Sequence, residues 1–192
     1  MTTGQPRSYP FYLVAGFTLG TMHVVVMGVT GSGKTTVGLR LASELRAEFA
    51  DGDGFHSPDA VAKMAQNVPL DDDDRLPWLE RVGAWLAEGD KRVVACSALK
   101  RSYRDIIRAY APQAVFIELW GDQKLLEERV RRRSATTEHF AGAGLLDSQF
   151  AIVQKLQPDE LGGSIDVGRY NPEGAVLMAR AILDAAKQSG AR

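Results

Sequence analysis

The sequence has little of what disulfide-stabilised, nucleic-acid-binding or membrane-spanning proteins require. Cys96 is the single cysteine among 192 residues, which excludes an internal disulfide and a zinc site built from several thiolates. Lys and Arg number 23 against 24 Asp and Glu, so no excess of positive charge points to nucleic acid or to an anionic membrane. No apolar run is long enough to cross a bilayer. Hydrophobic residues make up 45% of the chain, which at this length predicts one domain with its own core.

The first 22 residues differ from the rest. The stretch from Pro10 to Met22 is mildly apolar and follows Arg7, a pattern with some likeness to a secretory signal. The basic part of that pattern is weak, and no convincing cleavage site of small residues follows it. Met22 stands directly before the first expected strand. We therefore interpret residues 1–22 as a flexible extension and residues 23–192 as a single domain.

The stretch HVVVMGVTGSGKTT, from His23 to Thr36, carries the strongest functional signal. It matches the P-loop pattern G-x-x-x-x-G-K-S/T between a strand-like apolar run and a helix. Glycines in such a loop let backbone N–H groups wrap a phosphate chain, and the helix that follows offers its positive end to the same anion. Lys34 is expected to reach the β- and γ-phosphates, and the Thr35 hydroxyl to bind magnesium. The predicted nucleotide-binding residues are Gly28, Val29, Thr30, Gly31, Ser32, Gly33, Lys34, Thr35 and Thr36.

Strand and helix patterns alternate along the remaining chain, which predicts an α/β fold with a parallel sheet and right-handed crossovers. The expected strands cover residues 23–27, 48–51, 92–96, 114–120 and 164–167. The expected helices cover residues 34–46, 58–66, 76–88, 100–110, 122–133 and 145–156, with a last helix capped by Asn171. In such sheets the ligand lies outside the carboxyl ends of the strands, so the residues that follow each strand are the candidates for function.

Two carboxylates and a histidine follow the second expected strand. Asp51 and Asp53 stand one residue apart, so one could hold magnesium and the other could accept the proton of an attacking hydroxyl. We assign the metal to Asp51 and the proton to Asp53. A plain turn is the alternative, since aspartate and glycine are common turn residues. His56 follows directly, and we expect it to hydrogen-bond a substrate hydroxyl and not to act as an acid or base.

Positive charges near two other strand ends suggest an anionic acceptor. The acidic run from Leu70 to Asp74 is interpreted as a solvated loop, with Asp74 suited to the cap of the helix that follows. Arg75 follows it and could clamp a carboxylate at two points. After the third strand, Lys100 and Arg104 share one face at the start of a helix.

A run of arginines precedes a glycine-containing segment, residues 134–144. Arginines that lead into such a segment fit a lid, here about residues 129–148, which closes over phosphates and stabilises charge in the transition state. A solvated helix face is the alternative for at least two of the four. They are Arg129, Arg131, Arg132 and Arg133.

With these residues assembled, the chain resembles the gluconokinase family of small P-loop kinases. The resemblance rests on the stretches MGVTGSGKTTVG, DGDGFHSPD, KMAQNVPLDDDDRLPWL, CSALKRSYRD, VFIELWG and HFAGAGLLDSQF. It implies a P-loop NTPase fold of the nucleoside-monophosphate-kinase type, a five-stranded parallel sheet flanked by helices, with a lid. It further implies phosphorylation of D-gluconate to 6-phospho-D-gluconate with ATP and Mg²⁺, in a cytoplasmic homodimer that binds neither nucleic acid nor membrane.

The resemblance also gives roles to the clusters, because gluconate is a polyol with a carboxylate. Arg75, Lys100 and Arg104 become the carboxylate clamp, Asp53 and His56 the hydroxyl partners, and His139 a further substrate ligand. Lys34, Asp53 and Arg133 become the catalytic residues, and Arg129 joins the nucleotide site. The chain departs from the family in three places. Gly54 stands where an acid is usual, Ser57 stands where a proline is usual, and the lid motif R-x-x-H-F-M-P is altered. Because five residues separate Arg133 from His139, both Arg129 and Arg133 remain candidates for the phosphates.

Two alternatives stay open. A shikimate kinase would share the paired acids and the carboxylate-binding arginines, although PLDDDDRLPWL and CSALKRSYRD argue against it. A nucleotide-binding regulatory switch belongs to another class, but the guanine motif N-K-x-D of a GTPase switch does not occur in the sequence.

Overall fold

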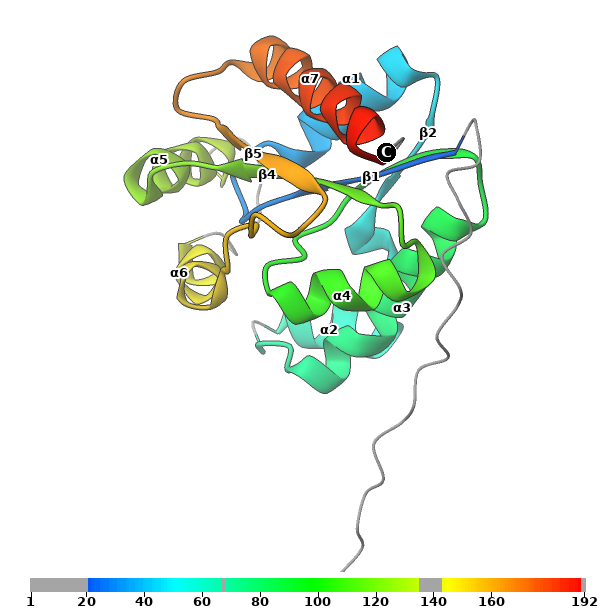
Figure 1. Ribbon diagram of the computed structural model, residues 1–192. Helices are drawn as coiled ribbons and strands as arrows, with labels where there is room; N and C mark the ends of the chain where they lie inside the picture. The colour runs from blue at the N-terminus through cyan, green and yellow to red at the C-terminus, as the bar shows by residue number, and fades with distance from the viewer. Residues whose placement is uncertain (1–20, 67, 135–142, 191–192) are drawn as a thin grey trace, which may run out of the picture.

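The computed structural model describes residues 21–66, 68–134 and 143–190 (Figure 1). Its centre is a five-stranded sheet in the order β2-β3-β1-β4-β5, in which every pair is parallel. This confirms the predicted fold class. The strands are β1 (Met22–Met27), β2 (Glu48–Asp51), β3 (Lys91–Ala95), β4 (Val115–Trp120) and β5 (Gly162–Asp166).

The first strand lies in the middle of the sheet because its residues are apolar on both faces. Val24 pairs with Val93 of β3 on one side and with Val115 of β4 on the other. Val24, Val25 and Val26 are fully buried, as expected for a central parallel strand covered on both faces. The P-loop that follows β1 is therefore attached to a central strand that is buried on both faces.

Helices cover both faces of the sheet (Figure 1). On one face lie α1 (Lys34–Leu45) and α7 (Pro172–Gly190), and on the other lie α3 (Asp72–Ala87) and α4 (Arg101–Tyr110). Near the latter pair lies α2 (Pro58–Ala65). The short helix η1 (Gly52–Phe55) follows β2, and α5 (Gln123–Ser134) and α6 (Ala143–Ile152) lie near the end of β4.

Alternate residues of β1 feed two separate cores. Val24 and Val26 pack with Leu41 of α1 in the first core, which α7 completes. Val25 and Met27 point to the opposite face and join the second core, formed with α3 and α4. This alternation follows from the two-residue period of a strand. Met27, in the second core, and Val29, in the first core, flank Gly28. Packing on both faces of the sheet therefore fixes the start of the P-loop.

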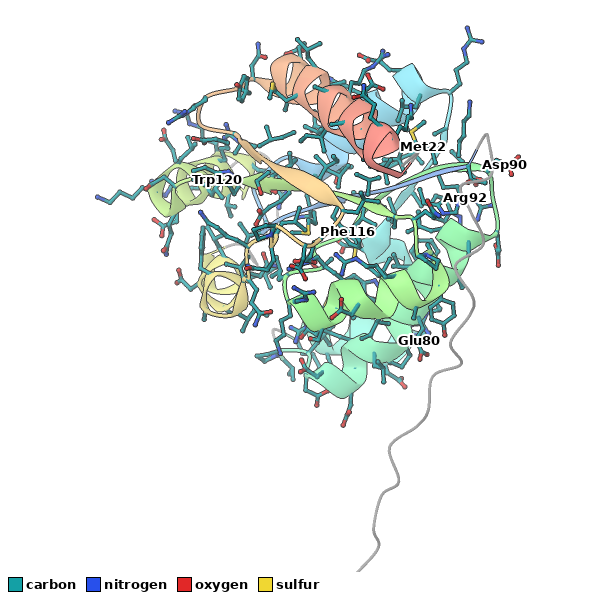
Figure 2. All side chains as sticks on the ribbon, in the orientation of Figure 1. Met22, Glu80, Asp90, Arg92, Phe116 and Trp120 are labelled. Carbon is teal, nitrogen blue, oxygen red and sulfur yellow. The ribbon has the colours of Figure 1, made fainter. Side chains whose placement is uncertain are left out.

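The two ends of the sheet can be located from labelled residues (Figure 2). Trp120, the last residue of β4, lies next to α5, whereas Met22 and Asp90 lie at the far end, where β1 and β3 begin. The carboxyl ends of the strands therefore meet on the α5 side. In the described part of the chain, no helix is both long and apolar enough to cross a membrane.

One helix begins earlier than the sequence pattern suggested. The acidic run expected to be a loop forms the first turn of α3, which begins at Asp72. Asp71 is the N-cap, and it exchanges hydrogen bonds with Asp74 in a capping box, so Asp74 belongs to the cap region as expected, at the third position of the helix. Acidic side chains in the first turn also suit the positive end of the helix.

The boundary of the expected N-terminal extension also changes slightly. β1 includes Met22, whose backbone N–H donates to the carbonyl of Asp90 at 2.6 Å. Residues 1–20 lie outside the described residues, so the interpretation of that segment as a flexible extension stays a prediction.

Candidate functional site

The P-loop begins with a glycine that no other residue could replace without strain. Gly28 has a φ of 143°, and a Cβ built on it would lie 2.3 Å from the carbonyl oxygen of Leu119. The loop thus turns away from β1 directly against the end of β4. Gly33 ends the loop with a φ of 95°, in the left-handed region that favours glycine. The sequence pattern and the backbone conformation agree at both positions.

The start of α1 provides unpaired backbone donors to the site. Gly33 is its N-cap, and within the described residues no side chain caps the helix. The first N–H groups of an α-helix have no partner inside the helix, so those of Lys34, Thr35 and Thr36 are available to an anion. The helix dipole favours negative charge at the same place.

Lys34 lies over the loop that it follows. Its Nζ donates to the carbonyl oxygen of Val29 at 3.1 Å. Burial lowers the pKa of Lys34, and the negative charges of Asp53 and Asp51 oppose that effect. The positive charge of Arg133 lowers the same pKa further. Lys34, the paired acids and Arg133 therefore share one electrostatic environment.

The two residues predicted to bind a metal are in direct contact. The Thr35 hydroxyl donates to Asp51 Oδ2 at 2.9 Å, and Asp51 Oδ1 accepts from the backbone N–H of Asp53 at 3.1 Å. Within the described residues, no group of three or more His, Cys, Asp or Glu side chains could hold a metal by itself. A hydroxyl and one carboxylate fit Mg²⁺, which keeps several waters and takes further oxygens from substrate phosphates.

Asp53 and His56 occupy the short helix η1 and the residue that follows it. Asp53 is exposed, and its charge is the strongest of those that act on both Lys34 and His56. The His56 ring stacks on Trp78 with the ring centres 4.4 Å apart. Trp78 in turn donates from Nε1 to the carbonyl of Gly52 at 2.7 Å, which ties α3 to η1.

His56 keeps one unused polar atom. Its Nδ1 is buried and has no hydrogen-bond partner within the described residues. Burial lowers the pKa of His56, and the charge of Asp53 opposes this while those of Arg81 and Arg75 add to it. The shift favours the neutral ring, which has both a donor and an acceptor to offer a hydroxyl group.

Arg75 and Lys100 converge on a carboxylate of the chain itself. Both Asp72 oxygens accept from Lys100 Nζ at 2.9 Å, and Arg75 Nη1 lies 3.8 Å from Asp72 Oδ1. The Tyr103 hydroxyl also donates to Asp72, and Arg75 Nη1 donates to that hydroxyl at 3.4 Å. Hydrogen bonds from Tyr103 and Lys100 lower the pKa of Asp72. The sequence analysis includes Asp72 in PLDDDDRLPWL and Tyr103 in CSALKRSYRD but gives neither residue a role in the site.

Arg104 does not reach this cluster, and we correct its predicted role. The residue is 0% exposed, and its guanidinium forms a two-point ion pair with Glu160 at 2.7 and 2.6 Å. Its remaining donors bind backbone carbonyls, including that of Gln154 at 3.0 Å. The four-residue spacing predicted that Arg104 lies beside Lys100. In the structure, Arg104 lies on the face of α4 that packs toward the chain before β5. It is a structural residue of the second core and not a substrate ligand.

The ion pair is held in its charged form. Burial alone would raise the pKa of Glu160, but hydrogen bonds from Arg104 and Arg108 outweigh it and hold the pKa at about 2. Arg108 Nη2 donates to Glu160 Oε1 at 2.5 Å. The pair is therefore ionised throughout the neutral range and connects α4 to the segment before β5.

The two candidate arginines of α5 lie in different places. Arg133 Nη2 donates to the Thr30 hydroxyl of the P-loop at 3.5 Å. Arg129 Nη2 donates to the carbonyl of Val167 at 2.8 Å, beyond the end of β5. The geometry thus favours Arg133 over Arg129 as the arginine nearer the phosphates. His139 lies outside the described residues.

Cys96 lies buried behind the acidic pair, at the end of β3. Burial raises the pKa of its thiol to about 12, so the thiolate is not formed at neutral pH. This agrees with the interpretation of Cys96 as a small apolar residue.

Gln149 of α6 was missed as a site residue. Its Oε1 accepts from the backbone N–H of Thr30 at 2.6 Å. The sequence places Gln149 in the stretch HFAGAGLLDSQF but gives no signal of this contact, since Gln149 and Thr30 are 119 positions apart.

The chain is similar in sequence and structure to gluconokinases. The thermosensitive gluconokinase of Escherichia coli (strain K12) is 41% identical over 140 residues, which cover 71% of this chain and 73% of that protein. The crystal structure of a gluconokinase from Sinorhizobium meliloti 1021 matches with a TM-score of 0.79 and 37% identity, over 88% of this chain and 95% of that one. No protein-family model matches the chain.

Shikimate kinase, the alternative considered from the sequence, shares the fold but little sequence. The enzyme from Aquifex aeolicus vf5 matches with a TM-score of 0.55 and 16% identity, over 87% of this chain and 99% of that one. Such a match shows a common fold.

Proposed function

The chain belongs to the gluconokinase family of P-loop kinases, and we propose that it transfers the γ-phosphoryl group of ATP to the 6-hydroxyl of D-gluconate. Membership of the family, at 41% identity over most of the chain, supports the choice of gluconate. The observation that carries the reaction type is the single site formed by Lys34, the Thr35–Asp51 pair and Asp53. Phosphoryl transfer needs positioned cations for the phosphates and a group that orients the attacking hydroxyl, and this site offers both.

The phosphate end is built for charge stabilisation. Backbone N–H groups at the start of α1 bind the phosphate oxygens, and Lys34 exchanges its bond to Val29 for the β- and γ-phosphates. Arg133 already reaches the P-loop at Thr30. Its positive charge stabilises the negative charge of the phosphoryl group during transfer. Arg129 lies beside Val167, so we place it at the nucleotide base and not at the phosphates.

The Thr35 hydroxyl and the Asp51 carboxylate would hold magnesium. When bound there, the ion would supply positive charge that offsets the negative charge of the phosphates. Asp51 also accepts from the backbone N–H of Asp53, so the same carboxylate that binds the metal fixes the start of η1.

Asp53 is the group that accepts the proton of the attacking hydroxyl. It is exposed at the mouth of the site and lies close enough to Lys34 and His56 for its charge to act on both. His56 presents a neutral ring with an unused buried nitrogen, which suits a hydrogen bond to a sugar hydroxyl. His139 stays a predicted substrate ligand.

The acceptor carboxylate binds where Asp72 now lies. Arg75, Lys100 and Tyr103 already surround one carboxylate, so their arrangement has the donors that gluconate requires. Arg75 also acts on His56 through its charge, which links the carboxylate end to the hydroxyl end. Arg104 is left out of this set because it is buried against Glu160.

A coupled assay of ADP release tests the proposal. We expect turnover with D-gluconate in the presence of ATP and Mg²⁺, and background rates with shikimate at the same concentration. The Lys34→Ala variant sets the background. Turnover with shikimate alone would reject gluconate, and ATP hydrolysis unaffected by any sugar acid would favour the regulatory switch. Identification of 6-phospho-D-gluconate as the product fixes the position of transfer.

We infer the assembly and location of the protein only from the resemblance to the family. A homodimer in the cytoplasm is the prediction. Light scattering after gel filtration measures the oligomeric state, and a monomeric mass at micromolar concentration would contradict the dimer.

A further inference from the structure

Gln149 links helix α6 to the backbone of the P-loop. Its side-chain oxygen lies 2.6 Å from the backbone nitrogen of Thr30. The orientation of the amide is fixed by chemistry, because a backbone N–H can only donate and the side-chain oxygen is the only acceptor that Gln149 has there. The Nε2 group therefore points to other partners, and it has none within the described residues.

Thr30 is held from two directions by residues of two helices. Its N–H binds Gln149 of α6, while its hydroxyl accepts from Arg133 of α5. The two helices are joined by a bond from Gln123 Nε2 to Asp147 Oδ1 at 3.1 Å. Leu146, which is fully buried, anchors α6 in the core. Gln149 is thus carried by a helix with a fixed position.

The hydrogen bond to Gln149 distinguishes the backbone N–H of Thr30 from those at the start of α1. The N–H groups that open α1 are free for an anion, whereas the N–H of Thr30 already has its partner. The neighbouring Gly31 has a φ of 78°, and a Cβ there would lie 2.8 Å from Val130 Cγ2, so the loop is packed tightly against α5. A small movement at Thr30 would therefore move the donors that follow it.

We propose that Gln149 is a positioning residue for the P-loop: it holds the Thr30 backbone so that the donors after it face the phosphates, and it thereby sets the affinity for the nucleotide. The inference rests on the proposed function only in taking a nucleoside triphosphate as the ligand. A role in filling the space between α6 and the loop is the competing explanation, and it predicts a loss of stability without a selective loss of nucleotide affinity.

Two variants separate these explanations. Gln149→Leu keeps the size of the side chain but removes the acceptor, and we expect the Kd of ATP to rise roughly 5- to 100-fold, the range that one unsatisfied buried donor corresponds to. Gln149→Glu keeps an acceptor for Thr30 but adds a charge beside the phosphates. We expect its unfolding midpoint to equal that of the wild type and its affinity for ATP to fall, with part of the loss recovered at high salt.

Calorimetric titration of the full chain with MgATP, without an acceptor, gives the readout. Because no phosphoryl transfer is needed, a wrong choice of gluconate leaves this test intact. Steady-state kinetics should then show a raised KM for ATP and a KM for gluconate within about twofold of the wild type, since a positioning role at Thr30 is selective. Ala151→Gln, an exposed change on the same helix, is the control and should bind ATP like the wild type.

Two results would overturn the proposal. One is wild-type ATP affinity in both Gln149 variants. The other is an equal loss of affinity for ATP and gluconate that follows the loss of stability. If Gln149→Leu fails to fold, the Gln149→Glu variant still decides, because an acid near Thr30 that leaves ATP binding unchanged would place that backbone away from the phosphates.

Discussion

The phosphate end and the acceptor end of this site differ in the groups that donate hydrogen bonds. At the phosphate end, glycine conformations and the first turn of α1 present backbone N–H groups, and Lys34 is the main side chain. At the acceptor end, the donors are side chains, and they are already paired: Lys100 and Tyr103 both bind Asp72. The phosphate end presents backbone donors without a partner inside the helix, whereas the donors of the acceptor end already bind the Asp72 carboxylate.

This difference has a consequence for binding. An anion at the phosphate end gains hydrogen bonds without displacing a partner other than the contact of Lys34 with Val29. Gluconate must instead compete with Asp72 for Arg75 and Lys100, or share them. Selectivity for the acceptor can then arise because only a ligand with a carboxylate can replace Asp72 as the partner of Arg75 and Lys100.

The largest expected effect is at the phosphate end. Lys34→Ala should lower kcat/KM by about 10³- to 10⁵-fold, similar to the loss of other cations that stabilise phosphoryl transfer. The variant should still fold, because Lys34 is partly exposed and its one hydrogen bond is to the loop itself. Initial rates with gluconate and MgATP measure the effect. Activity close to the wild type would reject the electrostatic role of the loop.

The second effect tests the residue that lies between the two ends. Asp53→Asn should lower kcat by roughly 10²- to 10⁴-fold, the usual contribution of a positioned acid or base. The isosteric amide keeps the shape of η1, and the bond from the backbone of Asp53 to Asp51 does not depend on the side chain. A raised KM for gluconate with an unchanged kcat would instead make Asp53 a binding residue.

The same division explains what the sequence could predict. The P-loop follows from spacing alone, because the conformations of Gly28 and Gly33 are local properties of the chain. The parallel sheet follows from the alternation of strand and helix patterns, whereas its strand order could be read only from the structure. Thr35 and Asp51 could both be assigned to the metal because they lie at the carboxyl ends of two parallel strands, β1 and β2, although they are 16 positions apart in the sequence.

The acceptor end and α6 could not be predicted as fully. The sequence spacing places Arg104 on one helix face with Lys100, whereas in the structure Arg104 is buried against Glu160, 56 positions away. The expectation of a solvated acidic loop fails at Asp72 because the capping box between Asp71 and Asp74 starts α3 at this residue. Contacts between distant side chains depend on packing, and packing leaves no local pattern.

The third effect tests whether Arg104 stabilises the fold through its buried ion pair with Glu160. Arg104→Met should lower the free energy of unfolding by about 3–5 kcal/mol, because it leaves the buried carboxylate of Glu160 short of its main partner. The double variant Arg104→Met/Glu160→Met should recover much of this loss, as replacement of a whole buried pair is often tolerated. Urea unfolding measures both. A stable Arg104→Met protein with a raised KM for gluconate would restore Arg104 to the substrate site.

A smaller effect tests the carboxylate clamp itself. Arg75→Ala should raise the KM for gluconate by about 10- to 100-fold, the range of one or two charge-assisted hydrogen bonds, with little change in the KM for ATP. Arg81→Ala is the matched control, because Arg81 lies on the same helix and acts on His56 but donates to the carbonyl of Phe55. Equal changes for both substrates would show that Arg75 supports the fold of the site and not the acceptor.

The smallest effect concerns Gly54, where the family usually carries an acid. Gly54 has an ordinary φ, and nothing lies within 4 Å of a Cβ built on it, so Gly54→Asp should change stability by less than about 0.5 kcal/mol. If Asp53 alone accepts the proton, kcat should stay within about threefold of the wild type, because the added carboxylate has no proton to take. A gain above tenfold would mean that the chemistry uses two acids beyond Asp51, and that this chain works with one of them missing. Comparing the kcat of Gly54→Asp with that of Asp53→Asn then decides whether proton acceptance depends on one carboxylate or on two.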